Sequence, residues 1–358
     1  MKLKLSEVSS GYTKNIAQKD LVNNNGSYPI YGASGYIKDV DFYVSDKPYI
    51  GIVKDGSGVG RVGLYPAYSS LLGTMQYILP KENIDIAYLM YALRKMKLGE
   101  TFSGAAIPHI YYKDYRKNEL NYREVSEQKA ISEELSCIEN TIVICENKIL
   151  TLDELVKSRF IEMFGEPLQP QKSRPLGDMA LLERGKFSPR PRNDPQYYNG
   201  IYPFVQTGDV ANCNHRLVSY HQTLNEKGIK VSKRFSSGTI LIALVGATIG
   251  ATAILEIDAY APDSLIGITP RQGVCDNVFL EILLQFWQPE LKRIAPDAAR
   301  ANINLGILEN IPIIDVDFAM QENFAFFVRK IDKLKLIVQK QIENLQELFD
   351  SKMDKYFG

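Results

Sequence analysis

The second half of the chain repeats the first half. Nine residues near the end of the first half recur, each 193 positions later, at the C-terminus. They are Gln128, Ile138, Ile149, Leu152, Glu154, Leu155, Ser158, Phe164 and Gly165, which recur as Gln321, Ile331, Ile342, Leu345, Glu347, Leu348, Ser351, Phe357 and Gly358. This duplication constrains the fold to two copies of one module.

Shorter matches in the same order extend the repeat along the chain. GSYPIYGASG (26–35) matches GIYPFVQTGD (200–209), and YLMYALRK (88–95) matches FLEILLQF (279–286). AIPHIYYKDYRKNELNY (106–122) matches RANINLGILENIPII (300–314). At 358 residues, the chain is long enough for two domains with proper cores.

Both copies contain a glycine-rich segment between two apolar runs. IGIVKDGSGVGRVGL (50–64) aligns with LIALVGATIGATAIL (241–255), so that Gly56 matches Gly246 and Gly60 matches Gly250. A phosphate-binding loop requires a lysine directly after its last glycine, and none follows Gly58 or Gly60. The spacing of the glycines also differs from that of a dinucleotide-binding site. We therefore predict a β-hairpin that is used twice.

The second hairpin lies in a stretch, 236–255, that has no charged residue and contains Gly246-x-x-x-Gly250. Such a pattern is typical of packed membrane helices. The matching segment of the first copy carries Lys54, Asp55 and Arg61, which argues against a membrane span for a shared element.

The composition favours a cytoplasmic protein without an overall excess of positive or negative charge. The four cysteines form no C-x-x-C pair, and the N-terminal MKLKLSEVSS lacks the apolar region of a secretory signal. The formal net charge is zero, so any surface that binds a polyanion must be local.

Each copy ends in a segment with a heptad pattern, which predicts a long helix. In the first helix, from residue 126 to 164, the apolar seam is Ile131, Leu135, Ile138, Ile142, Cys145, Ile149, Leu152 and Val156. In the second helix it is Phe324, Val328, Ile331, Val338, Ile342, Leu345 and Phe349, interrupted by Lys335. A charge on the seam lowers stability locally while helping to fix the pairing.

A helix of this span is about 58 Å long at about 1.5 Å per residue, too long to be covered by one small domain. We therefore predict that the two helices pair as an antiparallel coiled coil, which relates the two modules by a pseudo-two-fold axis. On pattern alone, the alternative is that each helix caps its own domain.

The order domain, helix, domain, helix resembles the specificity (S) subunit of Type I restriction-modification enzymes. The resemblance covers the whole chain and includes YPIYGASG, YPFVQTGD, the doubled hairpin and the helix ends RFIEMFGE and KMDKYFG. It implies an α+β fold with two mixed α/β target recognition domains. We expect domain 1 at 1–125, a central long helix and linker at 126–168, domain 2 at 169–318 and a C-terminal long helix at 319–358.

The resemblance implies a non-catalytic subunit that reads double-stranded DNA. In that family, each recognition domain reads one half of a split, asymmetric target. The paired helices set the spacer and hold two modification subunits, which methylate adenine at N6 with S-adenosylmethionine, and restriction subunits join them and cleave DNA with ATP. S-adenosylmethionine, ATP and Mg are therefore expected on partner subunits, and none on this chain.

The sequence motifs agree with a chain that has no catalytic site of its own. Asp194-Pro195-Gln196-Tyr197 lacks the second proline of the amino-methyltransferase motif, and His109 has no nucleophile and acid arranged with it as a triad. The trio Cys213, His215 and His221 lacks a fourth ligand, so we expect no metal.

Basic and polar side chains in loop-rich stretches are the candidate DNA contacts, the alternative being solvated surface charges. In the first half the candidates are Lys14, Lys38, Lys54, Arg61, His109, Tyr111, Tyr112 and Lys113. In the second half they are Lys186, Arg190, Arg192, Arg216, Lys230, Lys233, Arg234, Arg300 and Asn302. Arg300 and Asn302 are expected to read bases, because Arg pairs with guanine and Asn with adenine.

Two other functions remain open at this point. A self-contained enzyme would use the glycine-rich hairpin loops to bind a nucleotide or a sugar phosphate. A coiled-coil scaffold that binds only proteins would account for the helices, but not for two diverged heads.

Overall fold

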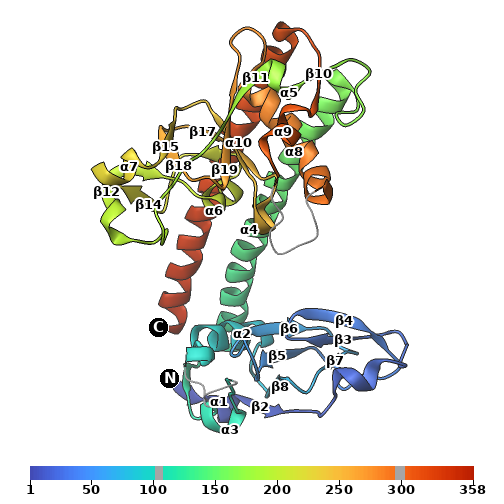
Figure 1. Cartoon of the computed structure of the whole chain (residues 1–358). Coiled ribbons are helices and arrows are strands. Elements are labelled where there is room, and N and C mark those ends of the chain that lie inside the picture. Colours follow the sequence, from blue (N-terminus) through green and yellow to red (C-terminus); the bar gives the residue numbers. More distant parts are fainter. Residues whose placement is uncertain (101–107, 295–302) are drawn as a thin grey trace. The chain divides into compact units, whose positions relative to one another are not determined.

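The computed structural model describes residues 1–100, 108–294 and 303–358. The chain divides into two compact units: the first unit is Met1–Asn147 with Val338–Gly358, and the second unit is Lys148–Ile337. Two long helices, α4 (Val125–Phe164) and α10 (Phe318–Phe357), contribute to both units (Figure 1). The remaining elements of each unit form a head, which we call the first head and the second head.

The first head combines short strands with one longer helix, α2. Its elements are β1 (Lys2–Lys4), α1 (Leu5–Val8), β2 (Ser9–Tyr12), η1 (Gln18–Leu21), β3 (Tyr28–Gly32), β4 (Gly35–Val40), β5 (Tyr49–Val53), β6 (Val62–Tyr65), β7 (Ser70–Leu71), β8 (Met75–Pro80), α2 (Ile86–Lys95), η2 (Leu98–Glu100), α3 (Tyr112–Tyr115) and β9 (Glu119–Asn121).

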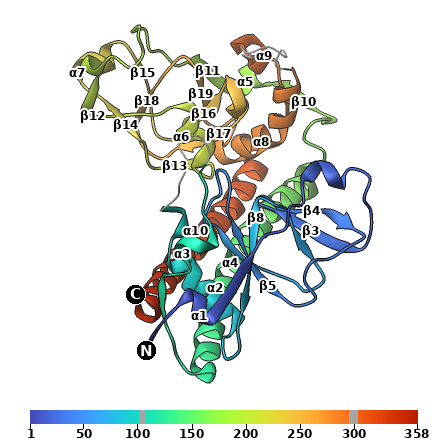
Figure 2. The same cartoon turned by 90° about the horizontal axis from the view of Figure 1, so that it is seen from below.

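The first head is built on an antiparallel sheet with the strand order β2-β8-β5-β6. Helix α2 packs against this sheet (Figure 2). It supplies Tyr88, Leu89 and Leu93 to the core. A smaller outer sheet has the order β4-β3-β7, and β1 pairs with β9.

The second head contains more elements than the first. They are β10 (Ser173–Pro175), α5 (Leu176–Met179), β11 (Ala180–Arg184), η3 (Pro195–Tyr197), β12 (Tyr198–Phe204), α6 (Thr207–Asn212), β13 (Arg216–Leu217), β14 (Gln222–Leu224), α7 (Glu226–Lys230), β15 (Lys233–Phe235), β16 (Ile240–Ala243), η4 (Gly246–Thr248), β17 (Thr252–Leu255), β18 (Ala259–Ala261), β19 (Leu265–Pro270), α8 (Asn277–Ile294), α9 (Leu305–Glu309) and β20 (Pro312–Ile314).

The two heads share one framework, which confirms the predicted α+β repeat. In the second head the sheet order is β11-β19-β16-β17-β13, and its first four strands correspond to β2-β8-β5-β6. Helix α8 takes the place of α2, and the pair β10–β20 takes the place of β1–β9. The outer sheet, β14-β12-β18-β15, keeps the parallel contact between β12 and β18 that corresponds to β3 and β7.

The glycine-rich segments form the predicted hairpins. Strands β5 and β6 pair antiparallel in the first head, as do β16 and β17 in the second. Gly56 and Gly60 have φ values of 92° and 84°, and Gly246 and Gly250 have 67° and 75°. Glycine adopts positive φ at no steric cost, which explains why both copies keep it at these positions. None of the described helices is long and apolar enough to cross a membrane.

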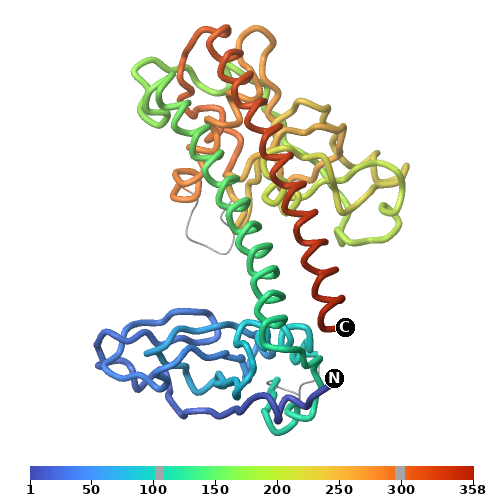
Figure 3. The backbone as a smooth tube through the Cα atoms, turned by 180° about the vertical axis from the view of Figure 1, so that it is seen from behind, coloured from blue at the N-terminus to red at the C-terminus, as the bar shows by residue number. Residues whose placement is uncertain are grey.

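The long helices pair as the heptads predict. Within the second unit, Asp153 of α4 binds Lys335 of α10, and further along α4 Phe160 packs against Phe324 with ring centroids 5.4 Å apart. Residue numbers rise along α4 while they fall along α10, so the helices run antiparallel (Figure 3). Each helix therefore packs on the other, rather than only capping its own head.

The predicted apolar seams are buried or half-buried throughout. Buried are Ile131, Leu135, Ile138, Val156, Phe324, Val328, Ile331 and Val338; half-buried are Ile142, Cys145, Ile149, Leu152, Ile342, Leu345 and Phe349. The charged seam residue Lys335 is compensated by its ion pair with Asp153.

A buried glutamine joins each long helix to its head. Gln128 accepts a hydrogen bond from the backbone N–H of Asp85 (2.9 Å) and donates to the carbonyls of Asn83 (3.1 Å) and Arg123 (2.8 Å). Gln321 makes the same three bonds, with Asp276 (3.0 Å), Val274 (3.1 Å) and Val316 (3.0 Å). Both side chains are completely buried, so each amide secures the loop that leads into α2 or α8.

We expect Gln128→Ala to lower the free energy of unfolding by about 3 kcal/mol, because it leaves a buried N–H and buried carbonyls without partners. The measurement is urea unfolding of the full chain. The control is Lys129→Ala at the exposed neighbouring position, which should change stability by less than about 0.5 kcal/mol. Equal stability of the two variants would contradict a structural role for the amide.

Candidate nucleic-acid interface

In the first head, the glycine hairpin is hydrogen-bonded to the segment that precedes α3. The backbone N–H of Ile110 donates to the carbonyl of Lys54 (3.0 Å), and that of Gly56 donates to Pro108 (3.1 Å). These bonds place His109 opposite Asp55, 54 positions away in the sequence. Two groups of predicted DNA contacts are thereby brought to one place.

Asp55 lies between two cationic or protonatable side chains. Its carboxylate is 2.9 Å from Lys54 Nζ and 2.7 Å from His109 Nδ1. Partial burial alone would raise the pKa of Asp55, but the hydrogen bonds and charges of Lys54 and His109 outweigh it and hold that pKa below its ordinary value. The carboxylate therefore stays ionised and orients both partners.

Aromatic and basic groups continue this surface toward α3. The Tyr111 ring stacks near the imidazole of His109 with centroids 6.3 Å apart, and Lys113 Nζ lies 5.2 Å from the Tyr111 centroid. Tyr111 and Lys113 are exposed. We call Lys54, Asp55, His109, Tyr111 and Lys113 the hairpin cluster; it can offer cations to phosphates and an aromatic edge to sugars or bases.

The other candidates of the first head lie elsewhere. Lys38 Nζ donates to the carbonyl of Leu21 and to Asn25 Oδ1, both at 3.0 Å. Arg61 donates to the carbonyl of Ala33 (3.0 Å), and Tyr112 donates to that of Ser9 (2.9 Å). These three side chains hold the chain's own loops, whereas Lys14 is exposed in the loop after β2.

In the second head, Arg190 and Arg192 converge on one carboxylate. Their guanidinium groups lie 3.7 Å and 2.7 Å from Asp263. Lys186 is exposed after β11, and Lys230, at the end of α7, is exposed with no side-chain partner among the residues that the structure describes. Two arginines facing one aspartate leave a local excess of positive charge.

The remaining candidates of the second head are paired within the protein. Arg216 Nη2 lies 2.7 Å from Asp332 of α10, so this arginine ties β13 to the long helix. Lys233 pairs with Glu183 (2.7 Å), and Arg234 pairs with Asp258 (2.5 Å). Arg300 and Asn302 lie outside the described residues.

The trio Cys213, His215 and His221 is engaged with separate partners. Cys213 Sγ donates to the carbonyl of Val210, His215 binds Glu281, and His221 binds Asp209. Over 1–100, 108–294 and 303–358, no three His, Cys, Asp or Glu side chains are grouped to hold a metal ion. Burial raises the pKa of Cys213 to about 11, so its thiol is protonated at neutral pH.

The glycine hairpin of the first head is poorly suited to cradle a phosphate. The N–H groups of Gly56, Val59, Gly60 and Arg61 all donate to carbonyls of the chain. A Cβ on Gly60 would lie 2.2 Å from the backbone nitrogen of Gly99, so the chain's own backbone fills that side of the turn. A phosphate site needs free N–H groups that converge on an open space, which weakens the nucleotide-enzyme alternative.

A buried acid of the second head was not predicted. Glu281 of α8 is 1% exposed and accepts hydrogen bonds from Thr252 Oγ1 (2.8 Å), Gln285 Nε2 (2.8 Å) and the ring of His215 (2.9 Å). The signal was present in FLEILL, where a glutamate interrupts an apolar run, but its partners are distant in sequence. Burial would lower the pKa of His215, yet the bond and charge of Glu281 outweigh it and raise that pKa.

Comparison with known proteins finds one family in both halves of the chain. The family model for the Type I restriction modification DNA specificity domain matches residues 1–154 and 170–347. The chain belongs to this family. It is therefore a DNA specificity subunit of a Type I restriction-modification system, from a family that is generally non-catalytic.

Two relatives are similar to the chain along most of its length. A protein of Methanocaldococcus jannaschii, named as the MjaX specificity subunit of a type I restriction enzyme, is 25% identical over 315 residues, covering 81% of this chain and 72% of the relative. The crystal structure of the S subunit from M. genitalium has a TM-score of 0.66 at 18% identity and covers 100% of this chain and 96% of that one.

A second solved structure concerns complex assembly and conformational transition of the type I system. It has a TM-score of 0.57 at 15% identity, covering 99% of this chain and 97% of its own. These structural likenesses establish the fold.

The pair His215–Glu281 predicts a pH-dependent contribution to stability. Because the folded-state pKa of His215 is raised, its contribution is complete below the unfolded value of about 6.5 and is lost as pH rises through the folded-state pKa. We expect His215→Gln to destabilise the protein more at pH 6 than at pH 8.5 in urea unfolding. His221→Gln, at an 89% exposed histidine, is the control; an effect of His215→Gln that is constant across this range would contradict the assignment.

Proposed function

We propose that this specificity subunit reads a split, asymmetric DNA target, with one head for each half-site. The observation that carries the proposal is a shared framework with different outer surfaces. The first head has a three-stranded outer sheet, β4-β3-β7, whereas the second has a four-stranded one, β14-β12-β18-β15, accompanied by α6 and α7. Different surfaces on equivalent frames favour two different half-sites rather than a palindrome.

We propose further that the hairpin cluster of the first head and the arginines beside Asp263 in the second contact DNA. Each surface includes an exposed basic side chain, Lys113 in the first head and Arg192 in the second, as phosphate contacts require. Because phosphate contacts release counterions, binding should weaken steeply as the salt concentration rises.

The long helices are proposed to bind two modification subunits. Val143 and Ile144 of α4 are 51% and 65% exposed, and Leu336 and Ile337 of α10 are 70% and 57% exposed. These pairs are 193 positions apart, the period of the repeat, as are the exposed residues Leu155 and Leu348. Exposed apolar residues at equivalent positions suit two copies of the same partner.

In the proposed complex the chemistry belongs to the partners. The modification subunits methylate adenine at N6 with S-adenosylmethionine, restriction subunits cleave with ATP and Mg, and the paired helices of this chain set the gap between the half-sites. This division agrees with Cys213, His215 and His221, each of which is engaged with a different partner within the chain.

The test is selection from a random duplex library by the chain assembled with its modification subunits. We expect one enriched motif with two different half-sites and a gap of constant length. The absence of any enriched split motif would contradict the proposal.

Two altered chains serve as matched arms of the same selection. Replacing residues 1–125 with the first domain of another family member should change one half-site and leave the other unchanged. Inserting seven residues into each long helix should change the gap and neither half-site. Loss of both half-sites after the domain exchange would show that the heads do not read independently. A gap of constant length after the insertions would show that the helices do not set the spacer.

We expect Ile144→Glu to remove one modification subunit from the complex and Ile337→Glu to remove the other, because each places a charge in an apolar contact. The double variant should bind neither, as read from the mass of the purified complex. Gln339→Glu adds the same charge at an exposed polar position of α10 and should keep both. Retention of two subunits by the double variant would exclude these docking sites.

A further inference from the structure

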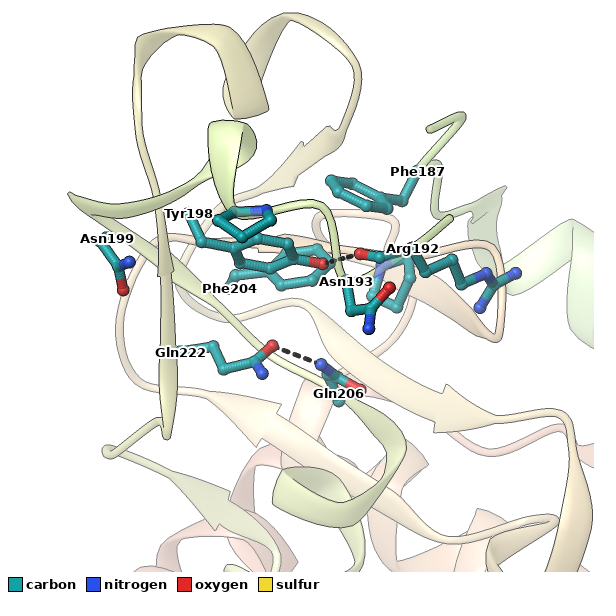
Figure 4. Close-up of a pocket in the computed structure, with 10 residues that line it drawn as sticks. Phe187, Arg192, Asn193, Tyr198, Asn199, Phe204, Gln206 and Gln222 are labelled. Carbon is teal, nitrogen blue, oxygen red and sulfur yellow. Dashed lines mark hydrogen bonds between the residues drawn. The ribbon is translucent and has the colours of Figure 1, made fainter. Parts of the chain in front are cut away.

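The second head contains a pocket of about 430 Å³ that none of the predicted roles explains. Its lining includes the aromatic side chains of Phe187, Tyr198 and Phe204 and the amides of Gln206 and Gln222 (Figure 4). The volume lies within the range typical of sites for small organic groups.

The aromatic side of the pocket is held firmly. Phe187 packs against Phe204 with ring centroids 5.1 Å apart and against Tyr198 at 5.8 Å. The hydroxyl of Tyr198 donates to the carbonyl of Arg192, which fixes the loop that closes this side. This packing holds the loop that carries Arg192 and Asn193 in place beside the amides.

The opposite side of the pocket is formed by two amides that face each other. Gln206 Nε2 donates to Gln222 Oε1 at 2.5 Å. This bond leaves Gln206 Oε1 as an acceptor and Gln222 Nε2 as a donor, neither of which has a partner among the described residues. Both side chains are exposed, so the two free atoms are accessible from solvent.

We infer that this amide pair reads one adenine in the half-site of the second head. In the major groove, adenine presents the N7 acceptor beside the N6 amino donor, and one free donor with one free acceptor complements that edge. Guanine presents two acceptors instead, so Gln206 Oε1 would face an acceptor. The inference rests on the proposed function, because it assumes that the second head lies against a DNA groove.

The neighbouring charges support a DNA ligand over a neutral small molecule. Arg192 lines the pocket and, with Arg190, flanks Asp263. Two arginines beside a base-reading amide can bind the phosphates that flank the base. The side chain of Asn193 also lines the pocket and has no hydrogen-bond partner among the described residues, so it remains available to a neighbouring base.

The first head lacks an equivalent of this amide pair. Alignment of GSYPIYGASG with GIYPFVQTGD places Gly32 at the position of Gln206. The alignment is supported by Gly26 and Gly200, because an added Cβ would lie 2.2 Å from Val40 O at the first position and 2.3 Å from Leu224 O at the second. Reading by an amide pair should therefore be confined to the half-site of the second head.

The test repeats the library selection with the assembled complex that carries Gln206→Ala and Gln222→Ala together. We expect the preference for adenine at one position of one half-site to fall about 10-fold or more, with the other half-site and the gap unchanged. Gln206→Arg, which replaces the acceptor with donors, should shift the preference at that position toward guanine. Gln272→Ala, at an exposed glutamine outside the pocket lining, is the control.

The outcomes separate this inference from the function on which it rests. If the wild-type complex selects a split motif and the double variant selects the same motif with equal preference, the amide pair does not read a base. An equal loss of affinity for all sequences would likewise overturn base reading. Tight binding of free adenosine by the chain alone, with an unchanged motif in the double variant, would assign the pocket to a small ligand. Failure of the wild-type complex to select any motif would instead overturn the proposed function.

Discussion

The buried amides of Gln128 and Gln321 are the contacts on which the rest of each unit depends. Each satisfies one backbone donor and two backbone acceptors in a place that water does not reach. In such surroundings a partly satisfied amide is costly, so the three bonds select one position of the long helix against its head. Because both units use the same bonds, each long helix is joined to its head in the same way.

On this fixed frame the outer sheets are free to differ. The central sheet and the helix α2 or α8 supply the core, and the outer strands carry the exposed loops. A change in those loops alters what is recognised without disturbing the joint between head and helix. The pocket of the second head lies beside the outer strands β12 and β14, whereas the hairpin cluster lies on the hairpin of the central strands β5 and β6 and on the segment before α3.

Patterns with short periods were predictable from the sequence. The heptad seams and the two hairpins follow from local spacing, and so does the charge at Lys335 that interrupts the second seam, although its partner Asp153 was not foreseen. The candidate DNA contacts were harder to rank, because residue type and loop position do not reveal a partner. Arg216 looked equivalent to Arg192, yet it binds Asp332 of α10, whereas Arg192 binds Asp263 and lines a pocket.

The sequence by itself determined the duplication, the helical seams and the glycines of the turns, since each depends on contacts with near neighbours or on a repeating period. Only the tertiary structure decided which distant side chains meet: His109 with Asp55, His215 with Glu281, and Gln206 with Gln222. Such pairs depend on how strands from separate parts of the chain are placed beside one another. No local spacing encodes that placement, because it results from the packing of the whole head.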